Sequence, residues 1–485
     1  MINNKKILKL ISFVLIIFSI CTFFYLTQVL LENGYNQLYI LPFSFLICFL
    51  LFLKPVFLNR QSIFVNVFIA SIFARYVILP FLMTLTNYYY YSRSINPPNS
   101  ESIRKAIFLM SYELFIVSIA LLFIFYFFSD NHTKRKERYN LVTDKITYKE
   151  HNPKFIFATN NIGYFGFFML TTILIILFPS TLLNFNFLST DESLVSSFSE
   201  GGLLYSIVVY CIMTLKNLLF VSLIYIFGKI YNNRRNYFWV LMSLILVFLN
   251  TSIFYGISRI DIIITAITSM IIFNGVFKMK KKFIPIIIMS LIVIGIFQSV
   301  TIARGIVGVK ESTSVFWDIT DKLSVYLGGP YNVAMAIETA EIFPESRHLS
   351  VFLFDIFRPM IGINVFVKDL PLFYSNIYFN ERIFYGIRVT QIIPMIGQGY
   401  LFFGFFGAPI ISILFIWIAK KFTEITLKLE NIRIEILYII TLSCIRLGFM
   451  LGQNTMNQVN DMSMNLFLFL IVYWINNNLV FKKLK

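Results

Sequence analysis

The sequence predicts an all-α polytopic membrane protein with about twelve transmembrane helices, both termini in the cytoplasm and one large extracytoplasmic loop with short amphipathic helices. Composition is the first reason: 58% of the 485 residues are hydrophobic and 13% are charged, and the mean hydropathy is +0.76. Length is the second, because the apolar residues form runs of about twenty, enough to cross roughly 30 Å of hydrocarbon. The third is periodicity: runs such as 11–30 are apolar on every face, whereas the strands of a membrane barrel alternate.

Each expected span is an apolar run between polar or charged residues, and the first follows the N-terminal lysines. That run is too long for a signal peptide and lacks a small-residue cleavage site, so we expect it to stay in the membrane. In order, the twelve spans are 7–29, 38–53, 63–85, 106–128, 155–178, 203–230, 237–255, 260–277, 283–302, 397–419, 433–450 and 462–480. Nine fall in 1–303 and three in 397–485, with the outer loop 304–396 between them in a single membrane domain.

The distribution of Lys and Arg orients these spans. With the N-terminus in the cytoplasm, 26 of the 41 Lys and Arg residues lie in cytoplasmic connections and four lie in the short outer ones. Such an asymmetry is the one described by the positive-inside rule. The net charge of +17 therefore reports topology, and no nucleic-acid partner is needed to explain it.

The outer loop 304–396 is where we expect function. It has about ninety residues, and loops well above about fifteen are usually functional or disordered. This loop is rich in Phe, Ile and Tyr and contains two amphipathic stretches, 314–327 and 331–343. We therefore expect short helices that lie on the outer membrane face and cover a cavity between the spans.

Two arginines flank neighbouring spans at the outer surface. Arg259 stands in the turn 255–261 at the outer start of one span, and Arg304 stands at the outer end of the next, so both should lie at the same depth. The planar guanidinium group suits bidentate phosphate binding, and a lipid-linked phosphate would lie at that depth. The alternative is that each arginine reaches to lipid headgroups or pairs with a carboxylate such as Asp261.

Few candidate acids and bases lie near these arginines: Asp261, Glu338, Glu341, Glu345, His348, Asp355, Asp369 and Glu381. We select three of them as proton acceptors. Glu338 and Glu341 lie three apart on an expected helix and so share a face, and His348 is the histidine that falls outside the cytoplasmic connections. One of them could receive the proton of an attacking hydroxyl group. The alternatives are a solvated helix face for the two glutamates and an inert loop histidine.

Several enzyme classes leave no motif in the chain. It has no Walker loop, no HExxH motif, no Cys/His cluster and no DxD pair, while Asp318 and Asp321 make only a weak DxxD metal signal. No cytoplasmic connection exceeds about thirty residues, which leaves no room for a nucleotide-binding domain. The sequence thus predicts chemistry without a metal or cofactor, driven by an activated membrane substrate or by a gradient.

A set of features together resembles the Wzy-type oligosaccharide repeat-unit polymerases of bacterial O-antigens and capsules. These features are the number of spans, the large outer loop before the tenth, the turn 256-GISRIDIII-264, an arginine at the outer end of the following span, and the stretch 390-TQIIPMIGQGYLFFGFFGAPI-410. The glycines of the last stretch suit close helix packing, which is also ordinary in membrane helices.

The resemblance implies a metal-independent glycosyltransferase of the bacterial inner membrane. Its donor would be a glycan on undecaprenyl pyrophosphate, and its acceptor the hydroxyl group of an incoming lipid-linked repeat unit, with membrane lipid and a chain-length regulator protein as further partners. Arg259 and Arg304 would contact the pyrophosphate. The other substrate-binding candidates are Arg358, Arg382, Arg388, Tyr255, Ser258 and Gln398.

Two other functions remain open. The related lipopolysaccharide O-antigen ligases use a similar scaffold with a different acceptor. A flippase of lipid-linked oligosaccharides would use Arg75, Lys216 and Arg446, which fall inside spans, to line a polar path. Against a flippase, the two halves of the chain show no clear internal repeat, and the dominant outer loop suits a surface reaction.

Overall fold

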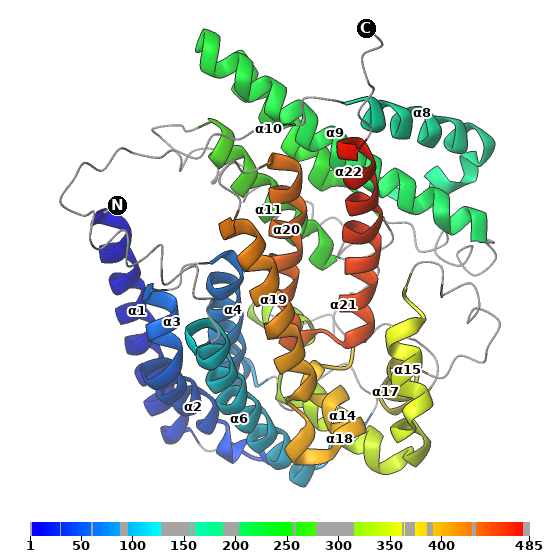
Figure 1. Ribbon diagram of the computed structural model, residues 1–485. Coiled ribbons are helices and arrows are strands. Elements are labelled where there is room, and N and C mark those ends of the chain that lie inside the picture. The colour runs from blue at the N-terminus through cyan, green and yellow to red at the C-terminus, as the bar shows by residue number, and fades with distance from the viewer. Residues whose placement is uncertain are drawn as a thin grey trace, which may run out of the picture. The chain divides into compact units, whose positions relative to one another are not determined.

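The computed structural model is almost entirely helical in the residues that it describes (Figure 1). These residues are 2–29, 31–59, 62–87, 96–127, 157, 161–187, 203–255, 259–277, 315–360, 363, 374–385, 391–428 and 433–478. The chain forms two compact units. The first unit consists of Met1–His151, Gly308–Glu424 and Cys444–Val459, and the second consists of Asn152–Val307, Ile425–Ser443 and Asn460–Lys485.

The N-terminal part of the first unit is a set of long apolar helices that run side by side, blue to cyan in Figure 1. Their bounds are α1 Ile2–Gln28, η1 Tyr35–Gln37, α2 Ile40–Cys48, η2 Phe49–Leu53, α3 Lys54–Asn59, α4 Ile63–Phe73, η3 Ala74–Ile78, α5 Leu79–Leu85, α6 Ser100–Leu122 and η5 Phe123–Phe127. Two starts are fixed by capping side chains. The Val65 amide donates to Ser62 Oγ at 3.1 Å before α4, and the Ser102 amide donates to Asn99 Oδ1 at 2.7 Å before α6.

The rest of the first unit comes from the expected outer loop and the segments after it. Its elements are α13 Val315–Leu327, α14 Pro330–Ile342, η8 Pro344–Arg347, α15 Leu349–Phe357, α17 Ser375–Phe384, α18 Met395–Gly407, α19 Ile410–Lys428, η9 Met450–Gly452 and the start of α21 Thr455–Met462. Prolines open α14 and η8 and cap α18, as expected of a residue that tolerates the first helical turn but not the interior.

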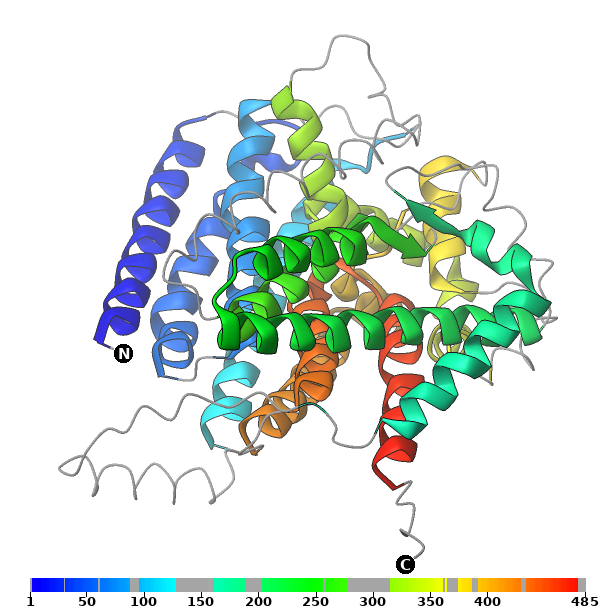
Figure 2. The same ribbon diagram turned by 90° about the horizontal axis from the view of Figure 1, so that it is seen from above.

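The second unit contains helices of very different lengths and one pair of short strands. Its elements are α8 Ile162–Leu177, η6 Pro179–Asn184, β1 Phe185–Phe187, α9 Leu203–Arg234, α10 Phe238–Ser252, β2 Ile253–Tyr255, α11 Arg259–Phe277, most of α20 Ile434–Gly448, η10 Ser463–Phe467 and α22 Leu468–Asn478. Strands β1 and β2 pair antiparallel, with Asn186 opposite Phe254. Figure 2 shows α10 and α11, in green, beside α9.

Six helices in the described part of the chain are long and apolar enough to cross a membrane, or seven if one bent pair counts as a span. The chain is therefore an all-α membrane protein. Two of the twelve expected spans, 155–178 and 237–255, correspond to the shorter helices Ile162–Leu177 and Phe238–Ser252. The expected span 283–302 lies outside the described residues.

One expected span is wrong as a straight helix. Instead of a single helix over 397–419, α18 and α19 meet at a bend of 108°. Two glycines explain the bend: Gly404 has φ of 67°, which side chains disfavour, and a Cβ atom on Gly399 would lie 2.0 Å from the Ala408 carbonyl oxygen. The glycines of this stretch were expected to allow close helix packing, and Gly399 and Gly404 also allow a sharp turn.

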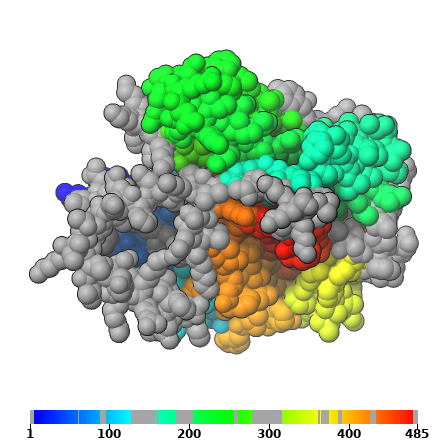
Figure 3. Space-filling view, turned by 45° about the horizontal axis from the view of Figure 1, so that its top comes forward, coloured from blue at the N-terminus to red at the C-terminus, as the bar shows by residue number. Residues whose placement is uncertain are grey.

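The first half of α19, a helix that is orange in Figure 3, exposes large apolar side chains. Ile410, Leu414 and Trp417 are 53%, 54% and 51% exposed, and their spacing of four and three residues puts them on one side of the helix. Such a stripe of large exposed apolar side chains is what a lipid-facing helix presents.

Helices α13 and α14 form a hairpin that enters the first unit between its long helices. The hydroxyl oxygens of Thr86, at the end of α5, and Thr320, in α13, lie 3.5 Å apart. Just after α13, in the turn to α14, the Gly328 carbonyl accepts a hydrogen bond at 3.0 Å from Arg75 Nε, halfway along the α4–α5 span. The hairpin tip therefore lies well inside the helix bundle.

The second helix of this hairpin corrects an expectation. The stretch 331–343 was expected to be an amphipathic helix on the outer membrane face, but every residue of α14 from Pro330 to Ala340 is buried. Helices α6, α17 and α18 contact it. Its small residues explain the burial, because Ala336 lies against Gly397 of α18, whose added Cβ atom would approach the Ala336 Cβ to 2.5 Å.

Candidate functional site in the first unit

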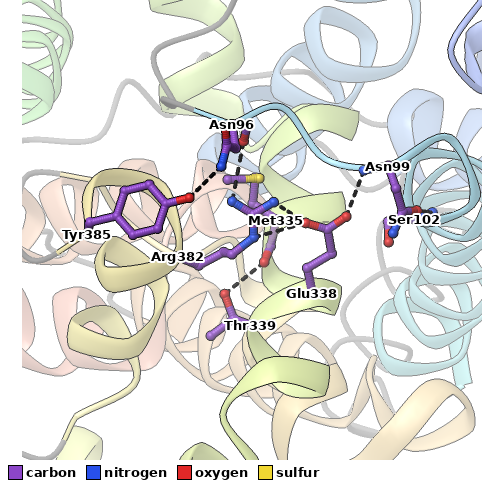
Figure 4. Close-up of polar contacts among 8 residues, drawn as sticks. All are labelled: Asn96, Asn99, Ser102, Met335, Glu338, Thr339, Arg382 and Tyr385. Carbon is purple, nitrogen blue, oxygen red and sulfur yellow. Dashed lines mark hydrogen bonds and ion pairs between the residues drawn. The ribbon is translucent and has the colours of Figure 1, made fainter.

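A carboxylate and an arginine that the sequence named separately form one ion pair (Figure 4). Glu338 is on α14 and Arg382 is on α17. Both Nη2 and Nε of Arg382 donate to Glu338 Oε2, at 2.5 and 3.0 Å. The other oxygen, Oε1, accepts from the Asn99 backbone amide at 2.7 Å. The pair thus ties α14 and α17 to the start of α6.

This ion pair is mostly removed from solvent. The side chains of Arg382 and Glu338 are 12% and 6% exposed. Arg382 Nη1 also donates to the Asn96 carbonyl at 3.3 Å, and the Asn96 amide donates to the Tyr385 hydroxyl at the end of α17. Glu338 Oε2 already accepts two hydrogen bonds, whereas Oε1 accepts one from Asn99 and keeps a lone pair that could accept from a substrate hydroxyl group.

Glu341 differs from Glu338 although both are on α14. It is exposed, and its Oε1 lies 3.5 Å from Lys105 Nζ, in a pair whose side chains are 46% and 43% exposed. Their spacing predicted that the two glutamates share a face of the helix, but Glu338 is buried and Glu341 is exposed. Of the three proposed proton acceptors, Glu341 and His348 are at the surface, and only Glu338 is buried.

A second polar chain links three segments of the first unit. Gln398, at the start of α18, donates from Nε2 to Asp355 Oδ2 at 2.6 Å and accepts at Oε1 from the Thr455 amide and hydroxyl, both at 2.8 Å. Asp355 Oδ1 accepts from the Ser375 amide at 3.1 Å. Gln398, a predicted substrate-binding residue, is thus a buried bridge between α15 and the start of α21.

Asp355 is a carboxyl group of this site whose acidity is altered by burial. Its side chain is fully buried on α15. Burial raises the pKa of Asp355 from its ordinary value of 3.8 to about 6, against the opposing hydrogen bonds from Ser375 and Gln398 and the charge of Arg358. A carboxyl group of that pKa in a polar cluster is a candidate for proton transfer near neutral pH.

Arg358, a predicted substrate-binding residue, follows Asp355 by three residues. Its guanidinium carbon lies 4.5 Å from the centre of the Tyr374 ring and 5.7 Å from that of Phe354. Stacking on aromatic faces orients an arginine while leaving its donors available to other groups. Arg358 therefore remains a suitable anion ligand beside Asp355.

The tip of the α13–α14 hairpin meets a buried charge pair. Arg75 Nη1 lies 2.8 Å from Glu113 Oε2, and the two side chains are 1% and 0% exposed. The Tyr76 hydroxyl and the Ser412 hydroxyl also donate to this carboxylate, at 3.3 and 3.2 Å. Sequence reasoning found Arg75 but missed Glu113, whose signal was a lone carboxylate within an apolar run.

Several buried amide atoms next to this tip find no hydrogen-bond partner in the described part of the chain. They are Gln453 Nε2, Asn454 Nδ2 and both amide atoms of Gln458. An unsatisfied buried polar atom costs about 1–3 kcal/mol. In the sequence, these amides are visible as the polar run 453-QNTMNQ-458, which separates two apolar runs.

The two arginines expected to hold pyrophosphate fall in the second unit. Arg259 is the first residue of α11, and Tyr255 ends β2, but their side chains are outside the described residues. Arg304, Ser258 and Arg388 also lie outside the described residues. The convergence of Arg259 and Arg304 therefore stays a prediction.

Known proteins give no relative for this chain: no family model, no curated protein and no solved structure matches it. Within the described ranges, no three His, Cys, Asp or Glu side chains lie together as a metal site would require.

Proposed function

We propose that the protein polymerises lipid-linked polysaccharide repeat units on the outer face of a bacterial inner membrane. In this proposal twelve spans place both termini in the cytoplasm. A glycan is transferred from undecaprenyl pyrophosphate to the hydroxyl group of an incoming lipid-linked unit. The new bond joins the acceptor oxygen to the anomeric carbon, the bond to pyrophosphate breaks with its electron pair, and a base takes the hydroxyl proton.

The observation that carries the proposal is the folding of the expected outer loop into the helices of the first unit. Glu338 and Arg382 of the loop contact Asn96 and Asn99, which belong to another connection that the charge distribution puts outside. Two segments assigned independently to the same side thus meet. A buried polar site at that level is where a lipid-anchored sugar phosphate would react.

The residues of the site suit separate roles in this reaction. Arg358, stacked beside Asp355, supplies positive charge for a leaving phosphate group, which is commonly the largest contribution to such catalysis. Asp355, with a pKa near 6, joins Glu338 as a candidate for the base. The contacts of Arg259 and Arg304 with the pyrophosphate are a separate proposal, which rests on the sequence alone.

A flippase is less well supported by the contacts of the three cations proposed for its path. Arg75 is 1% exposed and is bound to Glu113 and to the hairpin tip. Lys216 donates to the Ile253 carbonyl at 2.5 Å, and Arg446 is buried. Cations that line an aqueous path would instead keep contact with water.

The test is a reaction of the purified protein with a lipid-linked repeat unit, without added metal or nucleotide, scored for a ladder of products. We expect a ladder from the wild type and its loss in Arg358→Ala, with single units left on lipid. Arg347→Ala, an exposed arginine of the same loop, is the matched control and should keep the ladder.

Three results would overturn the proposal. The first is absence of a ladder from folded wild-type protein. The second is transfer of finished glycan to lipid A without growth, which would identify a ligase. The third is accumulation of undecorated units on the cytoplasmic side of cells that lack the protein, which would identify a flippase.

A further inference from the structure

The run 453–458 places three amide side chains in the interior of the first unit with unused hydrogen-bonding capacity. Gln453, Asn454 and Gln458 are 1%, 0% and 0% exposed. One donor nitrogen on each, and the Gln458 oxygen as well, has no partner among the residues that the structure describes.

The backbone needs of this segment are already met by other atoms. Asn454 caps α21, since its Oδ1 accepts from the Asn457 amide at 2.9 Å. Gln453 Oε1 accepts from Asn457 Nδ2 at 3.1 Å, and the Thr455 amide donates to Gln398. The fold therefore does not use the unpaired amide nitrogens, although most buried polar groups in proteins form hydrogen bonds.

The location joins these amides to the proposed site. Gly452, the residue before them, packs so closely on α13 that an added Cβ atom would lie 2.1 Å from the Tyr326 carbonyl oxygen. Gln398 connects Thr455 directly to Asp355. The amides therefore lie between the tip of the hairpin and the carboxyl group with the raised pKa.

The chemistry of the unused atoms indicates what they bind. Neutral amides that offer both donors and an acceptor match sugar hydroxyl groups, each of which donates one hydrogen bond and accepts others. A phosphate would instead be met by arginine or lysine, and the run 453–458 holds neither. Asn454 and Gln458 are four apart, so their side chains lie on the same side of α21.

We propose that Gln453, Asn454 and Gln458 form a subsite for the hydroxyl groups of the glycan carried by the lipid-linked substrate. The proposal rests on the proposed polymerase function and names the part of the substrate that this part of the protein holds. When the glycan enters, its hydroxyls pair with the amide atoms that the empty protein leaves unpaired.

The test compares ligand affinity and thermal stability in the full-length protein. Gln458→Met removes both unpaired atoms at similar volume, and Asn454→Ser removes the free nitrogen but keeps an oxygen to cap α21. The probes are a lipid-linked repeat unit and undecaprenyl pyrophosphate without sugar. The control is Asn380→Leu, because Asn380 donates to the Asn376 and Gln391 carbonyls and accepts from the Gln391 amide.

We expect Gln458→Met to raise the unfolding midpoint of the empty protein, because it removes unsatisfied groups, and to weaken binding of the lipid-linked unit about tenfold. Asn454→Ser should weaken it in the same direction, and neither variant should change binding of the sugar-free lipid. Asn380→Leu should lower the midpoint. If Gln458→Met does not fold, Asn454→Ser decides the test alone.

Unchanged affinity for the lipid-linked unit would overturn the subsite, whichever way the midpoint moves. A lower midpoint with unchanged affinity would identify structural water as the partner of the amides. These results are distinct from failure of the polymerase proposal. If the variants lose affinity only for the sugar-bearing lipid while the wild type forms no ladder, the subsite stands and the polymerase proposal fails. If the variants and the wild type form equal ladders and bind with equal affinity, the polymerase proposal stands and the subsite fails.

Discussion

Replacement of Arg382 by alanine should lower the free energy of unfolding by about 3 kcal/mol. In the wild type, Glu338 accepts three hydrogen bonds, two from Arg382 and one from the Asn99 amide. Without Arg382, a carboxylate of 6% exposure keeps one donor. Breaking a buried pair by removing one partner costs about 3–5 kcal/mol, and the slight exposure of this pair puts it at the lower end.

A double-mutant cycle separates the pair from its surroundings. Glu338→Met and Arg382→Met should each cost about 3 kcal/mol, but together they should cost about 3 rather than about 6, because the second change removes an already unpaired charge. The measurement is equilibrium unfolding in mild detergent, followed by far-ultraviolet circular dichroism. Strictly additive losses, or a loss below about 0.5 kcal/mol in either single variant, would refute the pairing.

The matched control lies on the same helix. Glu341 pairs with Lys105 at 3.5 Å, but both side chains are nearly half exposed. An exposed pair of this kind contributes between zero and about 1 kcal/mol. Glu341→Met should therefore have a small effect, and a loss as large as that of Glu338→Met would show that burial does not explain the difference.

Three further predictions concern other contacts of the first unit. Because the pKa of Asp355 is raised from 3.8 to about 6, the folded protein binds this proton more tightly than the unfolded chain. The unfolding free energy should then fall by roughly 3 kcal/mol as the pH rises from below 4 to above 6, and Asp355→Asn should lack this fall in pH-dependent unfolding curves. Gly452→Ala should cost about 2 kcal/mol in the same assay, because its Cβ atom would lie 2.1 Å from the Tyr326 carbonyl oxygen. Glu113→Leu should leave Arg75 as an unpaired buried charge, cost about 3–5 kcal/mol and reduce the yield of monodisperse protein. Arg75→Met in the same chain should restore most of that yield.

The membrane class was predictable because its signal is local. A run of about twenty apolar residues is both the cause and the evidence of a span, and the runs 7–29, 63–85, 203–230 and 260–277 each correspond to a helix long enough to cross. The bend between α18 and α19 was not predictable in this way. Hydropathy is unchanged across it, and the decisive feature is the approach of Gly399 to the Ala408 carbonyl, a contact in three dimensions.

Much of the candidate site was beyond sequence reasoning because its contacts are distant along the chain. Glu338 and Arg382 were both named, yet nothing local pairs residues separated by 44 positions. Gln398 was named from a family resemblance, whereas its partner Asp355 was one of several candidate acids and bases of the loop and was not selected as a site residue. Asp355 is on a short helix in a loop, where a carboxylate is normally solvated, and its complete burial depends on α17 and α18.

The tip of the α13–α14 hairpin and the Arg75–Glu113 ion pair stabilise each other. Irregular backbone at the depth of a membrane span is tolerated only where protein groups satisfy it. Gly328, with φ of 63°, ends α13 at that depth, and its carbonyl is satisfied by Arg75 Nε. The positive charge needed for that bond is in turn balanced by Glu113. A buried ion pair that would be costly in isolation is therefore part of the same arrangement that lets the expected outer loop enter the helix bundle, and the loop brings Glu338 with it.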